Sequence, residues 1–191
     1  MLNFSNSGKA SGPWARLDGR TGQMIISSPD GERQTVTLTG KVLAFNFCAA
    51  VQGWLLIKAA SADWQPIEDG NFGNPPSGDH KKGVELPIYS ATAFGDQPVR
   101  VARGNSVAWN GFIKEIYERS KAVVENGEAP ANRWPTIKVN SVTIVKIGKG
   151  SSVAFDFTLA PVEKWASPEV ASAPAKAAPV AKTAVMADEE F

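Results

Sequence analysis

The stretch TIKVNSVTIVKIGKGSSVAFDFTLA (136–160) carries a strong structural signal in this 191-residue sequence. Apolar and polar residues alternate through its first part, 136–148, and again through its second part, 152–160. Alternation with a period of two is typical of strands that bury one face and expose the other. The stretch therefore predicts two β-strands.

Earlier segments show a similar pattern. TVTLTGKV (35–42) and PVRVARG (98–104) alternate, and WLLIKA (54–59) is a short apolar run. Clusters rich in Gly and Pro separate these segments, and the longest cluster, about residues 68–83, predicts a surface loop. Several short strands with little helix predict a mainly β fold, an antiparallel barrel that is closed or nearly closed.

Residues 106–126 have two interpretations. A strand over 106–117, which we adopt, would bring one set of side chains to a single face: Val107, Trp109, Gly111 and Ile113. The alternative is a helix, because FIKEIYERSKAVVENG contains good helix formers and ends on Gly. Against the helix, Gly111 would lie in its first turns, where Gly costs roughly 1 kcal/mol relative to Ala. Because Trp109 is in register with Val107 and Ile113, we expect it to belong to the core.

Composition restricts the class of protein. Hydrophobic residues make up 43% of the chain, which is enough for a core, and no run approaches the ~20 apolar residues that span a bilayer. The first residues lack the charged and apolar regions of a secretory signal. The single cysteine, Cys48, excludes an internal disulfide framework and fits a reducing cytoplasm. We therefore expect a cytoplasmic protein.

The net charge of +1 conceals an uneven distribution. Residues 166–191 contain two lysines and four acidic residues, whereas residues 1–165 contain 18 basic and 15 acidic residues. The first part is thus mildly basic and the last part acidic. This asymmetry permits contact with nucleic acid but does not establish it.

The chain divides near residue 165. From Ala166 onward it is rich in Ala and Pro and has no aromatic residue before Phe191, so we predict a disordered tether over 166–191. A frayed terminus is the alternative. The return of acidic residues and an aromatic ring favours a docking peptide instead, formed by Asp188, Glu189, Glu190 and Phe191. Residues 1–165 form the predicted domain, with 1–33 as an extension packed on or beside the barrel.

Catalytic chemistry has few candidates. The single histidine, His80, lies in the polar loop sequence GDHKKG, where a solvated side chain is the simpler explanation. No Cys/His cluster has the spacing of zinc ligands, and no glycine-rich phosphate loop is present. We expect no catalytic residue, no metal and no cofactor, and so no enzyme.

Aromatic and basic residues are interleaved along the predicted strands and loops. Proteins that bind single strands without sequence preference need this mixture, because cations follow the phosphates and flat rings stack on any base. Any one ring can equally belong to the core, and for Trp54 the two interpretations stay open. The candidate DNA-binding residues are Trp54, Lys58, Trp64, Phe72, Lys81, Lys82, Arg100, Arg103, Tyr117, Arg119, Lys121, Arg133 and Trp134.

The segment 103–148 resembles the second half of the OB-fold in bacterial and phage single-stranded-DNA-binding proteins. In that family a glycine–valine–aromatic–glycine–isoleucine strand precedes a basic and aromatic hairpin arm and a valine-rich closing strand. The matching residues here are Gly104, Val107, Trp109, Gly111 and Ile113. Residues 35–42 are similar to the opening strand of the family, with Gly40 at its glycine position.

The end of the chain resembles this family more closely. Its members finish with a low-complexity tether and an acidic tip closed by phenylalanine, as residues 188–191 do here. The tip lacks the Ile-Pro step of the bacterial proteins and is nearer to those of phage members. The resemblance implies a five-stranded OB-fold barrel, here with extra N-terminal strands. It also implies sequence-nonspecific protection of single-stranded DNA in phage replication, recombination and repair, in the cytoplasm of the host cell.

The same resemblance implies partners. The tip would bind replication proteins such as a polymerase, helicase or primase, no membrane would be involved, and assembly into a homo-oligomer is left open. Two other functions stay in consideration. One is a β-barrel that only contacts proteins, as in a virion or host-takeover factor, and the other is a factor that anneals complementary strands.

Overall fold

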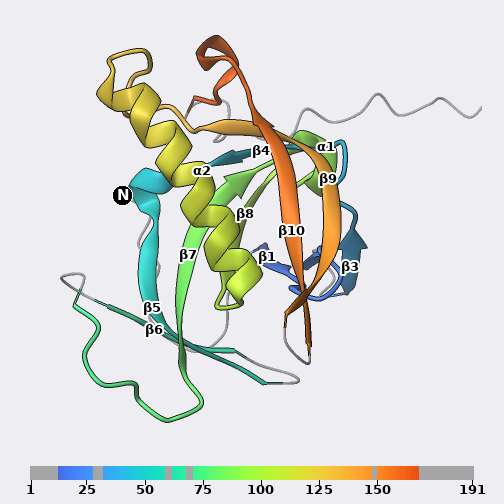
Figure 1. Ribbon diagram of the computed structural model, residues 1–191, viewed down its shortest axis with the longest axis vertical. Coiled ribbons are helices and arrows are strands. Elements are labelled where there is room, and N and C mark those ends of the chain that lie inside the picture. The colour runs from blue at the N-terminus through green and yellow to red at the C-terminus, as the bar shows by residue number, and fades with distance from the viewer. Residues whose placement is uncertain (1–12, 28–31, 59–61, 68–70, 148–149, 168–191) are drawn as a thin grey trace, which may run out of the picture.

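The computed structural model describes residues 13–27, 32–58, 62–67, 71–147 and 150–167, so the predicted tip Asp188–Phe191 lies outside the described residues. Strands dominate this part of the chain (Figure 1). They are β1 (Trp14–Leu17), β2 (Met24–Ser27), β3 (Arg33–Val36), β4 (Val42–Phe45), β5 (Val51–Ile57), β6 (Ala62–Pro66), β7 (Lys81–Tyr89), β8 (Val99–Gly104), β9 (Thr136–Ile147) and β10 (Gly150–Leu159). The helices are α1 (Ala91–Phe94) and α2 (Val107–Glu125), with 3-10 turns at Phe47–Ala49 and Val162–Lys164.

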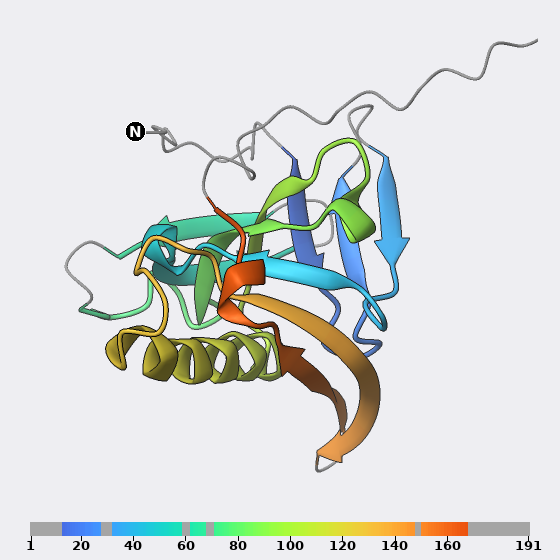
Figure 2. The same ribbon diagram turned by 90° about the horizontal axis from the view of Figure 1, so that it is seen from above.

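The described strands form one curled sheet. Their order is β10–β9–β4–β7–β8–β1–β2–β3, while β5 pairs with both β7 and β6. The pairing of β1 with β8 is parallel, and the other pairings of these strands are antiparallel. Seen from above, the sheet curves as an open half-barrel beside α2 (Figure 2). The prediction of a mainly β fold is therefore confirmed, and the described sheet is an open half-barrel.

Residues 107–125 form α2, so the strand predicted over 106–117 is wrong and the helical alternative is correct. Ser106 begins the helix, because its Oγ accepts a hydrogen bond from the backbone N–H of Trp109 at 3.1 Å. Gly111 lies on the exposed side with open space around it. Its cost of about 1 kcal/mol is small beside the roughly 1.5–3 kcal/mol gained for each large apolar side chain buried. The large buried side chains recur at helical spacing: Trp109, Phe112, Ile113 and Ile116.

Trp109 attaches α2 to the sheet. Its side chain is 1% exposed, which confirms the predicted core position. The indole Nε1 donates to the carbonyl oxygen of Val84 at 3.1 Å. The ring lies so close to Gly104 that a Cβ at that position would be 2.7 Å from ring atoms Cγ and Cδ1. A glycine on β8 is therefore needed for the helix to pack at this distance.

The N-terminal part of the chain contributes β1 and β2 to the same sheet. β1 pairs with β8, and β2 and β3 follow it outward. Gly22, in the turn between β1 and β2, has φ +71° and lies against the hairpin of β9 and β10. A Cβ on Gly22 would be 2.2 Å from Cγ1 of Val142 and 3.3 Å from Cγ1 of Val153. This contact joins the two ends of the curved sheet.

The strand predicted over 35–42 is wrong. β3 ends at Val36, β4 begins at Val42, and a turn containing Gly40 at φ +78° separates them. Leu38 is fully buried between the two strands, so its apolar character reflects packing of the turn. The other segments predicted as strands from alternation or apolar runs, 54–59, 98–104, 136–148 and 152–160, correspond to β5, β8, β9 and β10. Within the described residues no helix is long and apolar enough to span a membrane.

The contact at Gly22 predicts a difference between two glycine variants. Gly40→Ala places a side chain at positive φ in open space, so we expect a loss of about 1–2 kcal/mol in the free energy of unfolding. Gly22→Ala adds a clash with Val142, so we expect a further loss of about 1–3 kcal/mol. Urea unfolding of both variants measures this, and equal losses would contradict the proposed contact between the sheet ends.

Candidate nucleic-acid interface

Three of the predicted DNA-binding residues meet at the end of the sheet where β7 begins. We call Trp54, Phe72 and Lys82 the tryptophan–lysine cluster. The ring centroids of Trp54 and Phe72 are 5.4 Å apart at an interplanar angle of 85°. Nζ of Lys82 lies over both rings, 4.5 Å from the Phe72 centroid and 5.9 Å from that of Trp54. Two aromatic rings and one cation are thus held together.

Strand pairing and one loop assemble this cluster. Trp54 on β5 lies directly opposite Lys82 on β7, so the two side chains share one face of the sheet. Asn110, in the first turns of α2, donates from Nδ2 to the carbonyl oxygen of Lys82 at 3.3 Å. Phe72 comes from the segment 71–80 that leads into β7. Lys81, the preceding residue of β7, is exposed but pairs with Leu55, so its side chain lies on the opposite face of the sheet.

His80 holds the end of the segment that carries Phe72. Its Nε2 is 3.2 Å from Oδ2 of Asp63 on β6, and its Nδ1 is 2.8 Å from Oγ of Ser77. The imidazole is 8% exposed, in contrast to the solvated side chain that the sequence suggested. One ring nitrogen contacts β6 and the other contacts Ser77 of the same segment, and this arrangement positions the loop. Among the described residues, no group of three or more His, Cys, Asp or Glu side chains could hold a metal ion.

The cluster has the chemistry of a stacking platform. The rings of Trp54 and Phe72 are only half-buried, and the ammonium group beside them is exposed. A nucleobase can stack on such rings through dispersion, and Lys82 can approach the adjoining phosphate. Neither interaction depends on the identity of the base.

Trp64 on β6 and Arg103 on β8, also predicted to contact DNA, lie on the opposite face of the sheet from Trp54. The indole of Trp64 covers Gly53, where a Cβ would be 2.6 Å from the ring. The guanidinium of Arg103 lies 5.0 Å from the Trp64 ring and forms an ion pair with Glu85. Trp64 thus packs on the backbone of Gly53, and Arg103 contacts both the Trp64 ring and Glu85. These contacts make a packing role the better account of Trp64 and Arg103.

Arg100 and Trp134 are buried, and this corrects their assignment as DNA contacts. Arg100 is 3% exposed, donates from Nη1 to the carbonyl oxygen of Ser27, and lies over the ring of Phe94. Its Nε has no hydrogen-bond partner among the described residues, and burial lowers the pKa of its guanidinium below the usual range. Trp134 is 8% exposed and packs in a small apolar cluster with Ala44.

The remaining candidates are spread over other surfaces. Arg133 donates from Nη1 to the carbonyl oxygen of Trp165, and Lys58 is exposed just after β5. On α2, Tyr117 is 45% exposed. Arg119 pairs with Glu115, and Lys121 pairs with Glu125.

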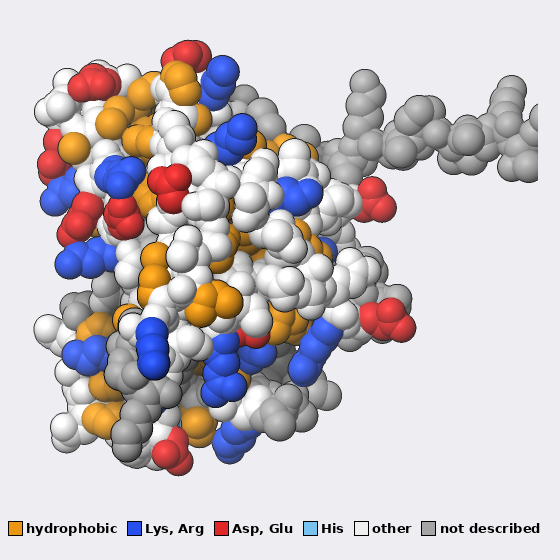
Figure 3. Space-filling model, turned by 45° about the vertical axis from the view of Figure 1, so that its right-hand side comes forward, with side chains coloured by type: hydrophobic (Ala, Val, Ile, Leu, Met, Phe, Trp, Pro, Cys, Tyr) orange, Lys and Arg blue, Asp and Glu red, His pale blue; other side chains and the backbone are white. Residues whose placement is uncertain are grey.

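Charge patterns distinguish these surfaces. In Figure 3 basic and acidic side chains alternate in the upper left of the view, whereas basic side chains predominate in its lower half. On α2, three ion pairs at i,i+4 spacing balance the charges of its exposed face. Such a face offers no net positive charge to a phosphate backbone, and this favours the tryptophan–lysine cluster as the candidate interface.

Comparisons with models of known protein families, with curated proteins and with solved structures gave no match. The candidate interface is therefore supported by its own geometry and by the sequence resemblance described above.

The pairing of Arg103 with Glu85 leads to a stability prediction. Their side chains are 26% and 14% exposed, so Glu85→Gln leaves a partly buried guanidinium without its counter-charge. We expect the free energy of unfolding to fall by about 1–3 kcal/mol. Glu118→Gln is the matched control, because Glu118 pairs with Lys114 at 3.6 Å with both side chains largely exposed. The control should lose less than about 0.5 kcal/mol in urea unfolding. A similar loss in both variants would show that the ion pair of Arg103 with Glu85 contributes no more to stability than an exposed pair.

Proposed function

We propose that this chain binds single-stranded DNA without sequence preference and protects it during replication and recombination. The observation that carries the proposal is the tryptophan–lysine cluster, in which half-buried aromatic rings lie beside an exposed ammonium group. Stacking supplies affinity for unpaired bases, and duplex DNA cannot use it because its bases are already stacked. Positive charge supplies the attraction to phosphates and makes binding dependent on salt.

The order of elements supports an OB-fold as the architecture of this domain. An OB-fold is a five-stranded, partly open Greek-key barrel, and β4 with β5, then β7, β8, β9 and β10 are the corresponding strands that we propose. α2 lies between β8 and β9, and β4 pairs with β9. β1 pairs with the edge of β8, and we propose that the N-terminal strands replace direct pairing of β8 with β10 in closing the barrel.

The acidic tip belongs to this proposal as the partner-binding element. Asp188, Glu189, Glu190 and Phe191 lie outside the described residues, so their role is supported by the sequence resemblance alone. We propose that Phe191 enters an apolar pocket on a polymerase, helicase or primase while the three acids contact a basic rim. Deletion of 188–191 would then abolish partner binding while leaving the domain able to bind single strands.

Titration with oligo-dT tests the function directly. Intrinsic tryptophan fluorescence of the full chain should be quenched saturably by the single strand, less so at higher salt, and not by duplex DNA. Trp54→Ala should weaken binding about 5- to 150-fold, because stacking on one aromatic side chain is worth roughly 1–3 kcal/mol. Since Trp54 is also a reporter, the affinity of this variant is measured with a labelled oligonucleotide.

Tyr117→Ala is the matched control for this titration. Tyr117 is an exposed aromatic residue on the charge-balanced face of α2, so its removal should change affinity less than twofold. An effect equal to that of Trp54→Ala would place the interface on α2 instead. No binding by the unaltered chain, with or without a label, would leave the protein-interaction function as the explanation. Active pairing of complementary strands would favour the annealing function.

A further inference from the structure

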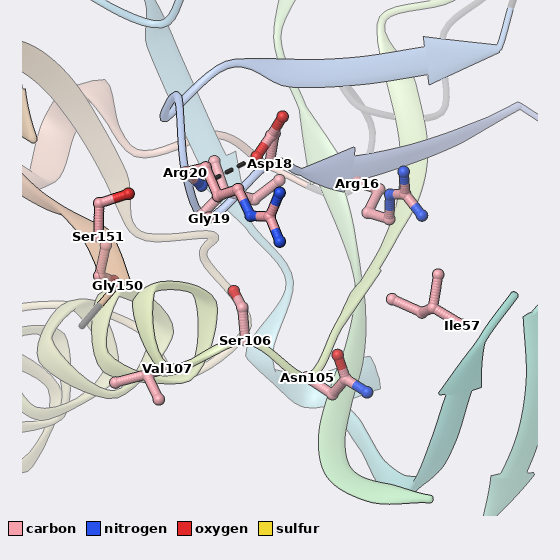
Figure 4. Close-up of a pocket in the computed structure, with 12 residues that line it drawn as sticks. Arg16, Asp18, Gly19, Arg20, Ile57, Asn105, Ser106, Val107, Gly150 and Ser151 are labelled. Atoms are coloured by element: carbon pink, nitrogen blue, oxygen red, sulfur yellow. Dashed lines mark hydrogen bonds between the residues drawn. The ribbon is translucent and has the colours of Figure 1, made fainter. Parts of the chain in front are cut away.

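A cleft of about 670 Å³ opens beside the first turn of α2 (Figure 4). Its walls come from the turn between β1 and β2, the end of β5, residues 105–107 and the start of β10. Arg16 and Arg20 line it, and neither was among the residues predicted to bind DNA. In Figure 4, Arg20 extends from the turn toward the start of α2, with Arg16 on the other side of the opening.

Neither arginine of the cleft has a charged partner among the described residues. Within the described residues no ion pair or hydrogen bond involves the guanidinium of Arg16 or Arg20. Arg103 and Arg119, by contrast, are each paired with a glutamate. Two guanidinium groups and one carboxylate, that of Asp18, line the cleft, so its lining carries a net positive charge. The cleft therefore has the electrostatic character of an anion site.

The lining of the cleft leaves these charges available. Asp18 is the acidic residue among those that line it, and its Oδ1 accepts the backbone N–H of Arg20 at 2.9 Å. The carboxylate therefore orders the turn that carries Arg20. Ser151 and Ser152, at the start of β10, add hydroxyl groups to the lining. Guanidinium forks and hydroxyl groups are the donors that proteins use for phosphate oxygens.

The cleft adjoins the tryptophan–lysine cluster. Asn105, in the cleft wall, donates from Nδ2 to the carbonyl oxygen of Leu55, the residue after Trp54. Ile57 also lines the cleft and lies three residues from Trp54 on β5, about 10 Å along the strand and on its opposite face. A single strand that passes around the end of β5 can therefore contact both places.

We propose that this cleft binds backbone phosphates of the same single strand whose bases stack on the tryptophan–lysine cluster. The inference rests on the proposed function and extends it. The cluster holds bases, and Arg16 and Arg20 hold phosphodiesters a few nucleotides further along. The ligand is thus a strand long enough to span both places, and a free mononucleotide does not satisfy the site.

The salt dependence of binding tests this proposal. Each phosphate contact contributes about 0.7 to the slope of log K against log salt for single strands, so two lost contacts reduce the slope by about 1.4. We expect this reduction for the double variant Arg16→Gln with Arg20→Gln on oligo-dT of about 16 nucleotides, and little change on oligo-dT of about 4. Trp54→Ala should instead lower affinity and leave the slope unchanged.

Two controls make the test specific. The variant Arg33→Gln with Lys138→Gln removes the same charge from exposed positions outside the cleft lining, and its slope should stay within about 0.3 of the unaltered chain. Arg20→Gln alone alters an exposed side chain in the turn, so it remains informative if replacement of the half-buried Arg16 disturbs folding. It should reduce the slope by about 0.7.

The outcomes separate this inference from the proposed function. If the unaltered chain binds oligo-dT through Trp54 but the cleft variants keep its slope, the cleft proposal is wrong and the function stands. If thymidine monophosphate or inorganic phosphate competes as strongly as the long strand, the proposal that the ligand is an extended single strand is wrong. If the unaltered chain binds no single strand, both proposals fail.

Discussion

The packing of Trp109 against Gly104 is the contact on which the rest of the structure depends. It buries the largest side chain of α2, satisfies the indole N–H with the carbonyl oxygen of Val84, and leaves no room for any side chain at Gly104. Because these atoms belong to β7 and β8, the start of α2 is fixed over the middle of the sheet. The positions of the residues on either side of Trp109 then follow from this contact.

That fixed start organises both surfaces proposed to contact DNA. Asn110 holds the backbone of Lys82 in the tryptophan–lysine cluster, and Asn105 holds the backbone of Leu55 beside the cleft. The two asparagines flank the same helical turn, so the backbone beside each surface is tied to the start of α2. A binding surface assembled on regular elements in this way is held more firmly than one on loops alone. In the tryptophan–lysine cluster Phe72 depends on a loop, which His80 anchors, and in the cleft Arg20 depends on a turn, which Asp18 orders.

Sequence patterns predicted the parts of this fold that are determined locally. Alternation identified β8, β9 and β10, because each buries one face against the same core. It failed at α2, where Val107 and Gly111 lie at exposed positions and share a period of two with Trp109 only by coincidence. Alternation also could not predict contacts between residues that are far apart in the sequence. The burial of Arg100 depends on Ser27 and Phe94, and the pairing of Arg103 with Glu85 depends on the register of β7 and β8.

The central claim is that bases stack on Trp54 and Phe72, and photochemical cross-linking of the full chain to oligo-dT containing 5-iododeoxyuridine tests it most directly. Excitation of the halogenated base joins it covalently to an aromatic ring in contact with it, and peptide mass spectrometry then identifies the ring. The account predicts adducts on Trp54 or Phe72 that excess unlabelled single strand suppresses and duplex DNA does not. Adducts confined to Tyr117 or to other aromatic residues, with none on the cluster, would contradict it.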